Sequence, residues 1–343
     1  MTQRDIVVIG ASAGGVEGLS ALVAGLPADL NASLFVVVHI PSSGTSVLPQ
    51  ILTRRGKLPA IHPDDGEAFE RGQIYVAPPG RHLILEKRRM RLVIGPTEHG
   101  VRPAVDPLFR SAGLNFRERV VGILLSGNLD DGTAGLEVIQ AVGGVTIVQD
   151  PAEALYDGMI KSAIDAGCAQ KILSISEIPS AIVELVGTGV AQGRPAMADE
   201  NEEVQDQKEL AIDKLNFRQL HGDDQPGVVS AFTCPDCHGT LWELTETDTL
   251  RFRCRVGHAY AIESLLAGQA EGVESAFWIA LRALEERAAL LRRLIDRARK
   301  TASKARVARY TEEEQIVAKR AKTLRDVILN GILTNDNQDS AHV

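Results

Sequence analysis

The sequence has no apolar run close to the roughly 20 residues that a membrane-spanning helix needs, and no basic stretch leads into an apolar segment at its N-terminus. It has only four cysteines, three of them clustered, which argues against a disulfide framework and favours a reducing compartment. Its net charge of −8 argues against a general nucleic-acid binder. We therefore expect a cytoplasmic protein that neither inserts directly into membranes nor binds nucleic acid.

The 343 residues, of which 44% are hydrophobic and 24% charged, leave room for roughly two domains. Short β-branched runs alternate with helical patterns from Asp5 to about Val186: "DIVVIG", "SLFVVVHI", "QIYVA", "VVGILLSG", "GVTIVQD" and "KILSI". Such nearly continuous apolar strands are buried on both faces, which predicts an α/β fold with a mainly parallel, doubly wound sheet. The segment "HLILEKRRMRLVIG" predicts an inserted β-hairpin.

The rest of the chain changes character several times. An acidic stretch with Pro and Gly predicts a flexible linker, the cysteines lie in a small module, and helical patterns cover about 262–300 and 312–329. We expect these helices to form a hairpin that packs on itself, with docking to a partner or to the first domain as the alternative. The predicted division is a first domain over 1–186, the linker over 187–227, the cysteine module over 228–262, the helical hairpin over 263–330 and a disordered tail over 331–343.

Three polar residues follow predicted strands in the first domain. Ser12 is the central residue of a G-x-S-x-G turn, the spacing that exposes a serine hydroxyl between a strand and a helix. It also stands where a dinucleotide-binding G-x-G-x-x-G motif would have glycine. His39 ends "FVVVHI" and Asp131 lies in "LLSGNLDDGTAGL". Because the carboxyl ends of parallel strands meet at one edge of a sheet, these residues are candidates for a Ser-His-Asp triad.

Each of the three also has a structural interpretation. Ser12 is suited to cap the following helix, His39 to be a hydrogen-bonded core histidine, and Asp131 or its neighbour Asp130 to be a turn or capping residue. Their joint occurrence at three strand ends favours catalysis over coincidence. From the residues alone, the first domain is predicted to be a serine hydrolase.

Six stretches occur in the order that is typical of one family: "VVIGASAGGVEGL", "VVVHIP", "DGEAFERGQIYVAPPGRHL", "RPAVDPLFRSAG", "GILLSGNLDDGTAGL" and "GGVTIVQDPAEALYDGM". Over about residues 4–186 the chain resembles the CheB-type protein-glutamate methylesterases of bacterial chemotaxis. The resemblance implies that Ser12 is the nucleophile, His39 the general base and Asp131 the residue that orients His39. It also implies hydrolysis of glutamyl methyl esters on methylated chemoreceptors or similar signalling proteins, with deamidation of glutamines in some members. No catalytic cofactor is implied, and the oligomeric state stays open.

The chain departs from this family beside the expected oxyanion site. A tetrahedral intermediate needs preorganised N–H donors, for which the backbones of Ala13, Gly14 and Asn128 are the candidates. The family usually has "TGMG.DG" where this chain has "SGNLDDG", so Asn128 stands for a methionine and Leu129 for a glycine. A catalytically weak scaffold in a signalling array, or a hydrolase for another ester, therefore remains an alternative.

Two further features bear on substrate binding and control. Arg102 matches a family motif and is a candidate contact for an acidic receptor surface, with an ion pair to Asp106 as the structural alternative. Family members usually begin with a phosphoacceptor receiver domain, whereas this sequence begins at the first strand of the hydrolase domain. We therefore expect the stand-alone form, active without phosphorylation.

The cysteine module has the spacing of a metal site. Cys234 and Cys237 form C-x2-C, and Cys254 and His258 form C-x3-H, with His238 as the rival fourth ligand. Three thiolates and an imidazole suit tetrahedral Zn²⁺ and leave no open position for catalysis. The module is therefore predicted to be a ribbon with structural zinc, whose removal is expected to spare the hydrolase activity.

Overall fold

The computed structural model of the chain describes residues 2–42, 44–187, 189–190, 227–244, 249–300 and 304–330. It contains two compact units, Met1–Leu265 and Leu266–Val343. Most of the predicted linker and the whole predicted tail lie outside the described residues, so the domain boundaries stay a prediction. No helix in the described part of the chain is long and apolar enough to cross a bilayer.

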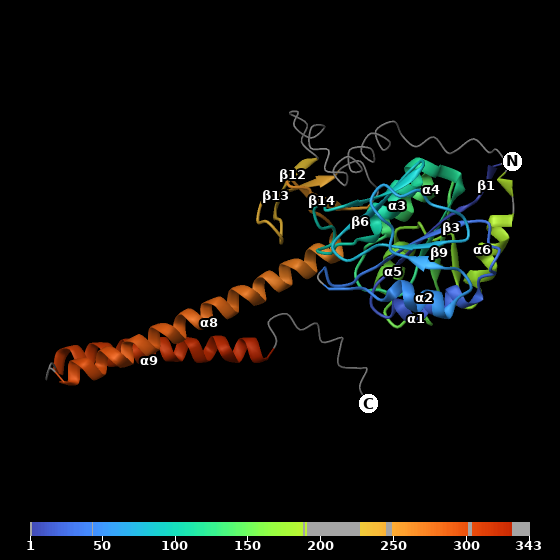
Figure 1. Cartoon of the computed structure of the whole chain (residues 1–343). Helices are drawn as coiled ribbons and strands as arrows, with labels where there is room; N and C mark the ends of the chain where they lie inside the picture. Colours follow the sequence, from blue (N-terminus) through green and yellow to red (C-terminus); the bar gives the residue numbers. More distant parts are fainter. Residues whose placement is uncertain are drawn as a thin grey trace. The chain divides into compact units, whose positions relative to one another are not determined.

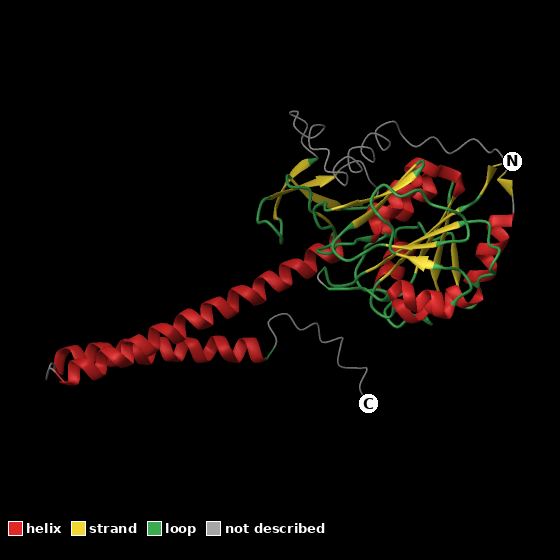
Figure 2. Ribbon diagram, in the orientation of Figure 1, coloured by secondary structure: helices red, strands yellow, loops and turns green. Residues whose placement is uncertain are grey.

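The first unit is built around a central sheet with helices packed around it (Figures 1 and 2). The sheet has seven parallel strands in the order β10-β9-β8-β2-β3-β5-β4. All six predicted strands are present, and every neighbouring pair runs parallel. The strands are β2 (Ile6–Ala11), β3 (Ser33–Val38), β4 (Ala60–Ile61), β5 (Ile74–Val76), β8 (Val120–Leu124), β9 (Val145–Gln149) and β10 (Lys171–Leu173). The mainly parallel α/β fold is confirmed, and in this sheet only the two-residue edge strand β4 was not predicted.

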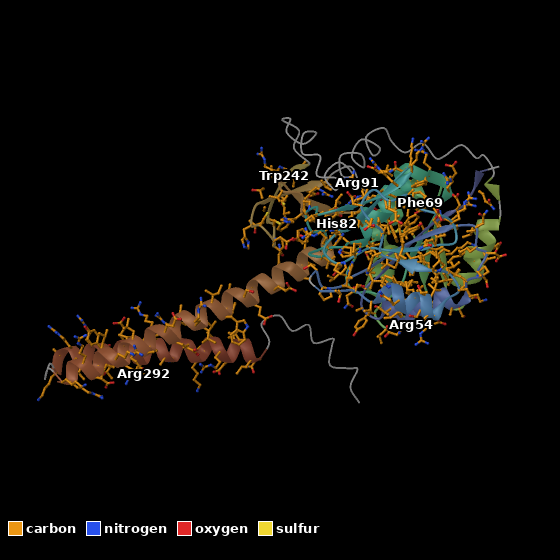
Figure 3. All side chains as sticks on the ribbon, in the orientation of Figure 1. Arg54, Phe69, His82, Arg91, Trp242 and Arg292 are labelled. Carbon is orange, nitrogen blue, oxygen red and sulfur yellow. The ribbon has the colours of Figure 1, made fainter. Side chains whose placement is uncertain are left out.

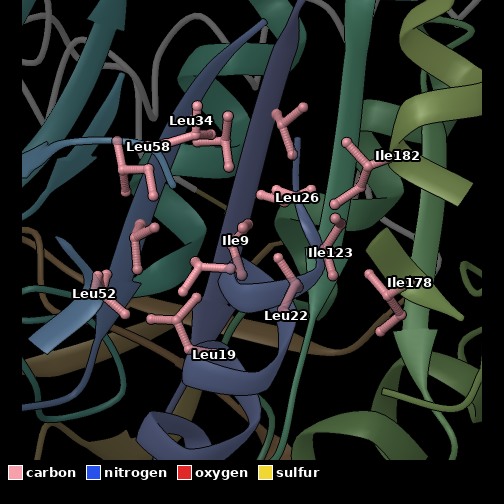
Figure 4. Packing of buried hydrophobic residues seen from close by; sticks show 14 of the residues in the cluster. Ile9, Leu19, Leu22, Leu26, Leu34, Leu52, Leu58, Ile123, Ile178 and Ile182 are labelled. Carbon is pink, nitrogen blue, oxygen red and sulfur yellow. The ribbon is translucent and has the colours of Figure 1, made fainter. Parts of the chain in front are cut away.

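Helices cover both faces of this sheet, which explains why its strands are apolar at every position. Along β2, Ile9 (Figure 4) and Val7 join the core on one face, and Ile6 and Val8 join the core on the other. The first face is covered by α1 (Gly15–Gly25), α2 (Leu48–Arg55) and α6 (Ile178–Gly187). The second is covered by α3 (Val105–Phe116), α4 (Thr133–Ala141) and α5 (Gly158–Asp165).

Three small elements complete the α/β part. The predicted hairpin is present as β6 (His82–Glu86) paired antiparallel with β7 (Arg89–Val93), and it packs on α3. One contact fixes its position, because the Leu85 N–H donates to Ser111 Oγ at 3.0 Å. The others are the short helix η1 (Arg117–Arg119) and the pair of β1 (Thr2–Gln3) with β11 (Gly189–Val190).

The cysteine module is a four-stranded antiparallel sheet within the same compact unit. Its strands are β12 (Val228–Thr233), β13 (Thr240–Leu244, which carries Trp242 in Figure 3), β14 (Arg251–Cys254) and β15 (Ala259–Ala261). A buried ion cluster joins it to the α/β part: Glu98 accepts from Arg110 at 2.7 Å and from Arg253 of β14 at 3.1 Å. These three side chains are at most 1% exposed, so the module is packed against the domain here.

The second unit is a helical hairpin. Helix α8 (Ile262–Lys300) matches the predicted range, whereas α9 (Lys304–Leu329) begins at Lys304 and not at Glu312. Ala288, Leu291 and Val317 form the core between the two helices. Exposed ion pairs flank it, including Arg292 (Figure 3) with Glu314 at 2.8 Å. The hairpin is therefore confirmed, and its apolar stripe packs at least partly on itself.

Candidate active site

The carboxyl edge of the sheet brings the three predicted catalytic residues to neighbouring strand ends. Ser12 follows β2 and His39 follows β3, and these strands end as the paired residues Ala11 and Val38. The His39 N–H donates to the Ala11 carbonyl at 3.1 Å, and the Ser12 N–H donates to the Ser126 carbonyl, in the turn after β8, at 2.9 Å. Asp131 lies in the same turn, so the topology alone explains their convergence.

His39 and Asp131 form a direct pair. His39 Nε2 lies 2.7 Å from Asp131 Oδ2, and the side chains are 15% and 1% exposed. Because Nε2 is engaged, Nδ1 is the ring nitrogen left to accept a proton from a nucleophile. The Ser12 hydroxyl makes no hydrogen bond to any described residue and does not cap α1. The structure thus joins two of the three residues by a hydrogen bond and leaves the serine hydroxyl uncommitted.

Asp131 is held as a carboxylate by several donors. Besides His39, its oxygens accept the N–H groups of Val105 at 2.7 Å and Asp106 at 3.0 Å, which form the first turn of α3. Burial opposes ionisation, but the charge of His99, the hydrogen bond from His39 and the N–H of Val105 outweigh it. They lower the pKa of Asp131 to about 2. Asp131 therefore does not cap the helix α4 that follows it, but it binds the first turn of α3 as well as His39.

The turn after β8 packs so closely against Ser12 that position 127 needs glycine. Ser126 Oγ donates to the Ala13 carbonyl at 2.8 Å, which holds the Ser12 turn against the turn after β8. A Cβ on Gly127 would lie 2.8 Å from the Ser12 Cβ and 2.1 Å from Met159 Sδ, distances that no side chain tolerates. A side chain at position 127 would therefore displace Ser12.

The proposed oxyanion donors lie beside this turn. Among the described residues, the N–H groups of Ala13, Gly14 and Asn128 donate no backbone hydrogen bond, so they are available to a ligand. Leu129 has φ 64°, the left-handed conformation that glycine adopts without strain. The turn keeps the conformation that suits the family's usual glycine, at the cost of local strain at Leu129.

Arg102 does not form the ion pair with Asp106 that the sequence allowed. Its Nε donates to the Gly80 carbonyl at 2.9 Å, and its Nη1 donates to the Gly95 carbonyl. Asp106 instead pairs with His99 Nε2 at 3.0 Å. A role for Arg102 in binding substrate stays a prediction.

A mainly apolar pocket is lined in part by the two residues that follow His39 in the chain. It has a volume of about 320 Å³, and Ile40 and Pro41, the two residues after His39, line it together with Val47 and Leu48. An apolar pocket with its wall in the His39 loop is suited to bind the aliphatic part of a peptide side chain or of a neighbouring turn.

Two residues of this site, His99 and Ser264, were not predicted, and Asp130 was expected only as a turn or capping residue. The His99 side chain is 3% exposed and lies between the carboxylates of Asp106, Asp130 and Asp131. Burial opposes its protonation, but the charge of Asp131, the hydrogen bond to Asp106 and the nearby Asp130 carboxylate outweigh burial and raise the pKa of His99 well above its usual range. The sequence carries no periodic signal for such a cluster, because its other members are 7, 31, 32 and 165 positions from His99 in the chain.

The four predicted metal ligands also converge. The ligand atoms of Cys234, Cys237, Cys254 and His258 lie within 4.8 Å of one another, whereas His238 is exposed outside the cluster. The Cys237 and Cys254 sulfurs are 3.7 Å apart, and His258 Nδ1 lies 3.5 Å from the sulfurs of Cys234 and Cys254. Tetrahedral Zn²⁺ with ordinary bond lengths requires about 3.8 Å between sulfurs and about 3.6 Å between sulfur and nitrogen. The geometry therefore fits a zinc ion.

Comparison with known proteins agrees with this arrangement. The chain is 39% identical over 181 residues to "Protein-glutamate methylesterase/protein-glutamine glutaminase 2" of Anaeromyxobacter dehalogenans, covering 53% of either protein. It is 37% identical over 187 residues to the "Protein-glutamate methylesterase/protein-glutamine glutaminase" of Symbiobacterium thermophilum, covering 54% of this chain and 52% of that protein. The chain thus spans about half the length of the curated relatives that it matches.

A solved structure covers the same part of the chain. The CheB methylesterase catalytic domain of Thermotoga maritima is similar with a TM-score of 0.52 and 32% sequence identity, over 54% of this chain and 100% of that domain. The family profile described as CheB methylesterase matches residues 7–182, which is just over half of the 343 residues. The chain therefore belongs to the CheB methylesterase family.

Proposed function

We propose that this protein hydrolyses glutamyl methyl esters on chemoreceptors or related signalling proteins, and that it also deamidates glutamines at such sites. The names of its relatives support both activities. The observation that carries the proposal is the buried Asp131 carboxylate 2.7 Å from His39, at the sheet edge where Ser12 lies uncommitted. A scaffold needs neither this pair nor a free serine hydroxyl, so the scaffold alternative is not favoured.

The proposed reaction uses these groups in two stages. His39 Nδ1 takes the Ser12 proton while Oγ attacks the ester carbonyl, and Asp131 stabilises the imidazolium that forms. The N–H groups of Ala13, Gly14 and Asn128 are the proposed donors to the oxyanion. His39 then gives its proton to the departing methanol, and a water molecule activated by the same ring hydrolyses the acyl-serine to a glutamate carboxylate. The low pKa of Asp131 keeps it ionised throughout.

The proposed substrate segment lies across the edge of the sheet. The pocket lined by Ile40 and Pro41 is assigned to apolar groups that flank the glutamyl ester. Arg102, which is half-buried and bound to two carbonyls, is assigned to acidic groups of the receptor.

We further propose that the ribbon holds one structural Zn²⁺ through Cys234, Cys237, Cys254 and His258. The fit of their separations to a tetrahedron supports this assignment. Because all four positions are filled by protein, the ion would stabilise the ribbon and take no part in hydrolysis. Such thiolates stay intact in a reducing compartment, in keeping with the expected cytoplasmic location.

Methanol release tests the proposed activity. Purified protein is incubated with methylated chemoreceptor, and the wild type is compared with Ser12→Ala. The matched control is Ser20→Ala, which removes a serine hydroxyl that is bound only to the Val16 carbonyl on α1. Ser12→Ala is expected to lower the rate by about four orders of magnitude or more. Methanol release that persists in Ser12→Ala, or that is absent from the wild type, would contradict the proposal.

Elemental analysis tests the metal site. One zinc per chain is expected in the wild type and less than one in Cys234→Ser, whereas Cys168→Ser is the control. Cys168 is buried in the core of the α/β part, where its thiol donates to the Ala163 carbonyl, and it is not part of the cluster. A metal-free wild type whose ribbon remains folded would refute the assignment.

A further inference from the structure

The ribbon and the first turn of α8 reach the catalytic aspartate through one buried histidine. His99 Nδ1 lies 2.9 Å from Ser264 Oγ of α8 and 3.2 Å from Asp130 Oδ1. Its Nε2 lies 3.0 Å from Asp106 Oδ2 and 3.6 Å from Asp131 Oδ1. Its main-chain N–H donates to the Ala259 carbonyl of β15 at 2.8 Å. One side chain thus touches the C-terminal segment on one side and the carboxylate that binds His39 on the other.

The hydrogen-bond pattern fixes the protonation state of His99. Nε2 is hydrogen-bonded to Asp106 Oδ2, so it carries hydrogen, and Nδ1 is hydrogen-bonded to Ser264 Oγ with the Asp130 carboxylate 3.2 Å away. Ser264 Oγ also accepts the Ala261 N–H at 3.1 Å and donates to the Ala261 carbonyl at 3.2 Å. Its own hydrogen is thereby committed, which leaves an acceptor for His99 Nδ1–H. His99 is therefore an imidazolium that offsets part of the charge of three buried carboxylates.

Asp130 makes the second link to the C-terminal segment. Its Oδ2 accepts the N–H groups of Glu263 at 2.9 Å and Ser264 at 3.3 Å, which are unpaired donors of the first turn of α8. A carboxylate at a helix N-terminus is also favoured by the helix dipole. Since Asp130 precedes Asp131 directly, the start of α8 holds the turn that presents the catalytic aspartate.

We propose that His99 is a positioning residue for Asp131, and that Ala259, Ser264 and the first turn of α8 complete the active site by holding His99 and Asp130. This inference rests on the proposed hydrolase function, because Asp131 acts through His39. It makes the C-terminal segment part of the catalytic architecture. The cluster is not a second metal site, because Glu98 is bound to Arg110 and Arg253, and Asp106 Oδ1 accepts the Gly135 N–H at 2.7 Å.

The other charged groups nearby do not neutralise the cluster. Glu98 is paired with two arginines, and burial lowers the pKa of His82, which is held neutral by its bonds to the Pro96 carbonyl and the Ala104 N–H. The balance around Asp131 is therefore set by Asp106, Asp130, His99 and His39. Changing the charge of His99 or Asp130 changes the field at His39 in opposite directions.

The first test uses the opposite effects that the charges of His99 and Asp130 have on His39. His39 must be neutral to act as a base, so the loss of kcat/KM on the acid side of the pH profile, its acid limb, reports the protonation of His39. His99→Gln removes a positive charge and is expected to move this limb to higher pH by about one unit, while Asp130→Asn moves it to lower pH by a similar amount. In Asp130→Asn the amide oxygen of the new side chain still accepts the α8 N–H groups. The double variant removes one charge of each sign and is expected to restore the limb.

The second test asks whether the contact with α8 matters. Ser264→Ala is expected to lower kcat about 10-fold or more with little change in KM, because Asp131 is displaced and substrate contacts are not. Ser264→Thr keeps the hydroxyl and is expected to restore most of kcat. Thr249→Ala is the control, since it removes a 3.1 Å contact between the ribbon and Glu137 of α4 that does not involve His99, Asp130 or the triad.

The outcomes separate this inference from the proposed function. If Ser12→Ala retains activity, the proposed function itself fails. If Ser12→Ala is inactive but the two charge variants move the acid limb in the same direction or not at all, the positioning role of His99 is refuted. If Ser264→Ala matches the wild type, or Ser264→Thr fails to recover kcat, the contribution of α8 is refuted. The Ser264 variants keep the inference testable should His99→Gln fail to fold.

Discussion

Replacing Asp131 by asparagine should cost both stability and rate. In the folded protein the Asp131 carboxylate accepts three N–H groups, from His39, Val105 and Asp106. Asparagine offers one acceptor oxygen, so its amide nitrogen would face buried donors. A carboxyl whose pKa falls from 3.8 to about 2 on folding contributes about 2 kcal/mol at neutral pH. We expect Asp131→Asn to lose at least this stability at pH 7 and to lower kcat by about four orders of magnitude.

The pH dependence carries a definite sign. Because the pKa of Asp131 is lower in the folded state, its contribution is complete above about pH 4 and is lost as the pH falls toward about 2. Urea unfolding of wild type and variant should therefore differ by a constant free energy from pH 5 to 7, and by less at pH 3. The control is Asp150→Asn, which lies after β9 at the same sheet edge and binds only the exposed Ala152 N–H. Equal unfolding free energies of wild type and Asp131→Asn at pH 7, or a difference that grows toward pH 3, would refute this reasoning.

Three further changes probe the site and its supports. Gly127→Ala places a Cβ 2.8 Å from that of Ser12, so kcat should fall about 100-fold, whereas Gly18→Ala, with 3.7 Å to its nearest neighbours, should leave kcat unchanged; a fully active Gly127→Ala enzyme would show that the turn yields. Leu129→Gly relieves the left-handed strain at φ 64° and should raise the free energy of unfolding by about 1 kcal/mol, and no gain in urea unfolding would mean that the strain is absent. Chelation of the proposed zinc should loosen β15 and the start of α8 and lower kcat, and kcat should recover when zinc is added. If kcat is unchanged in protein shown to be metal-free, the active site does not depend on the ribbon metal.

The fold was predictable because its signals are local. In β2 the run Ile6–Ile9 has no polar residue, and this pattern is typical of a strand covered on both faces. The glycine-rich turn after it and the helical spacing of Leu19, Leu22 and Val23 then predict a crossover. Strand β4 was missed because two residues carry no periodicity. The early start of α9 at Lys304 was missed because its first turns are polar and exposed, so no apolar stripe marks them.

The predicted triad residues follow from the same logic, since strand ends in a parallel sheet share one edge. The supports of the triad do not. Ser264 meets His99 and Asp130 through folding of segments more than 130 positions apart, and none of the three stands in a spacing pattern that indicates contact. The expectation that the ribbon is irrelevant to hydrolysis came from the ribbon's own residues, which carry no catalytic motif. The contacts of Ala259 and Ser264 with His99 lead us to the opposite expectation.

Covalent labelling of Ser12 tests the central claim most directly. A fluorophosphonate reacts with a serine hydroxyl that a neighbouring base activates, and it leaves a stable phosphonyl ester that peptide mapping locates. We expect one phosphonyl group per chain, on Ser12, with methanol release from methylated chemoreceptor lost in proportion to labelling, and no labelling in His39→Gln. Labelling of another serine, or complete labelling of Ser12 with methanol release intact, would contradict the account.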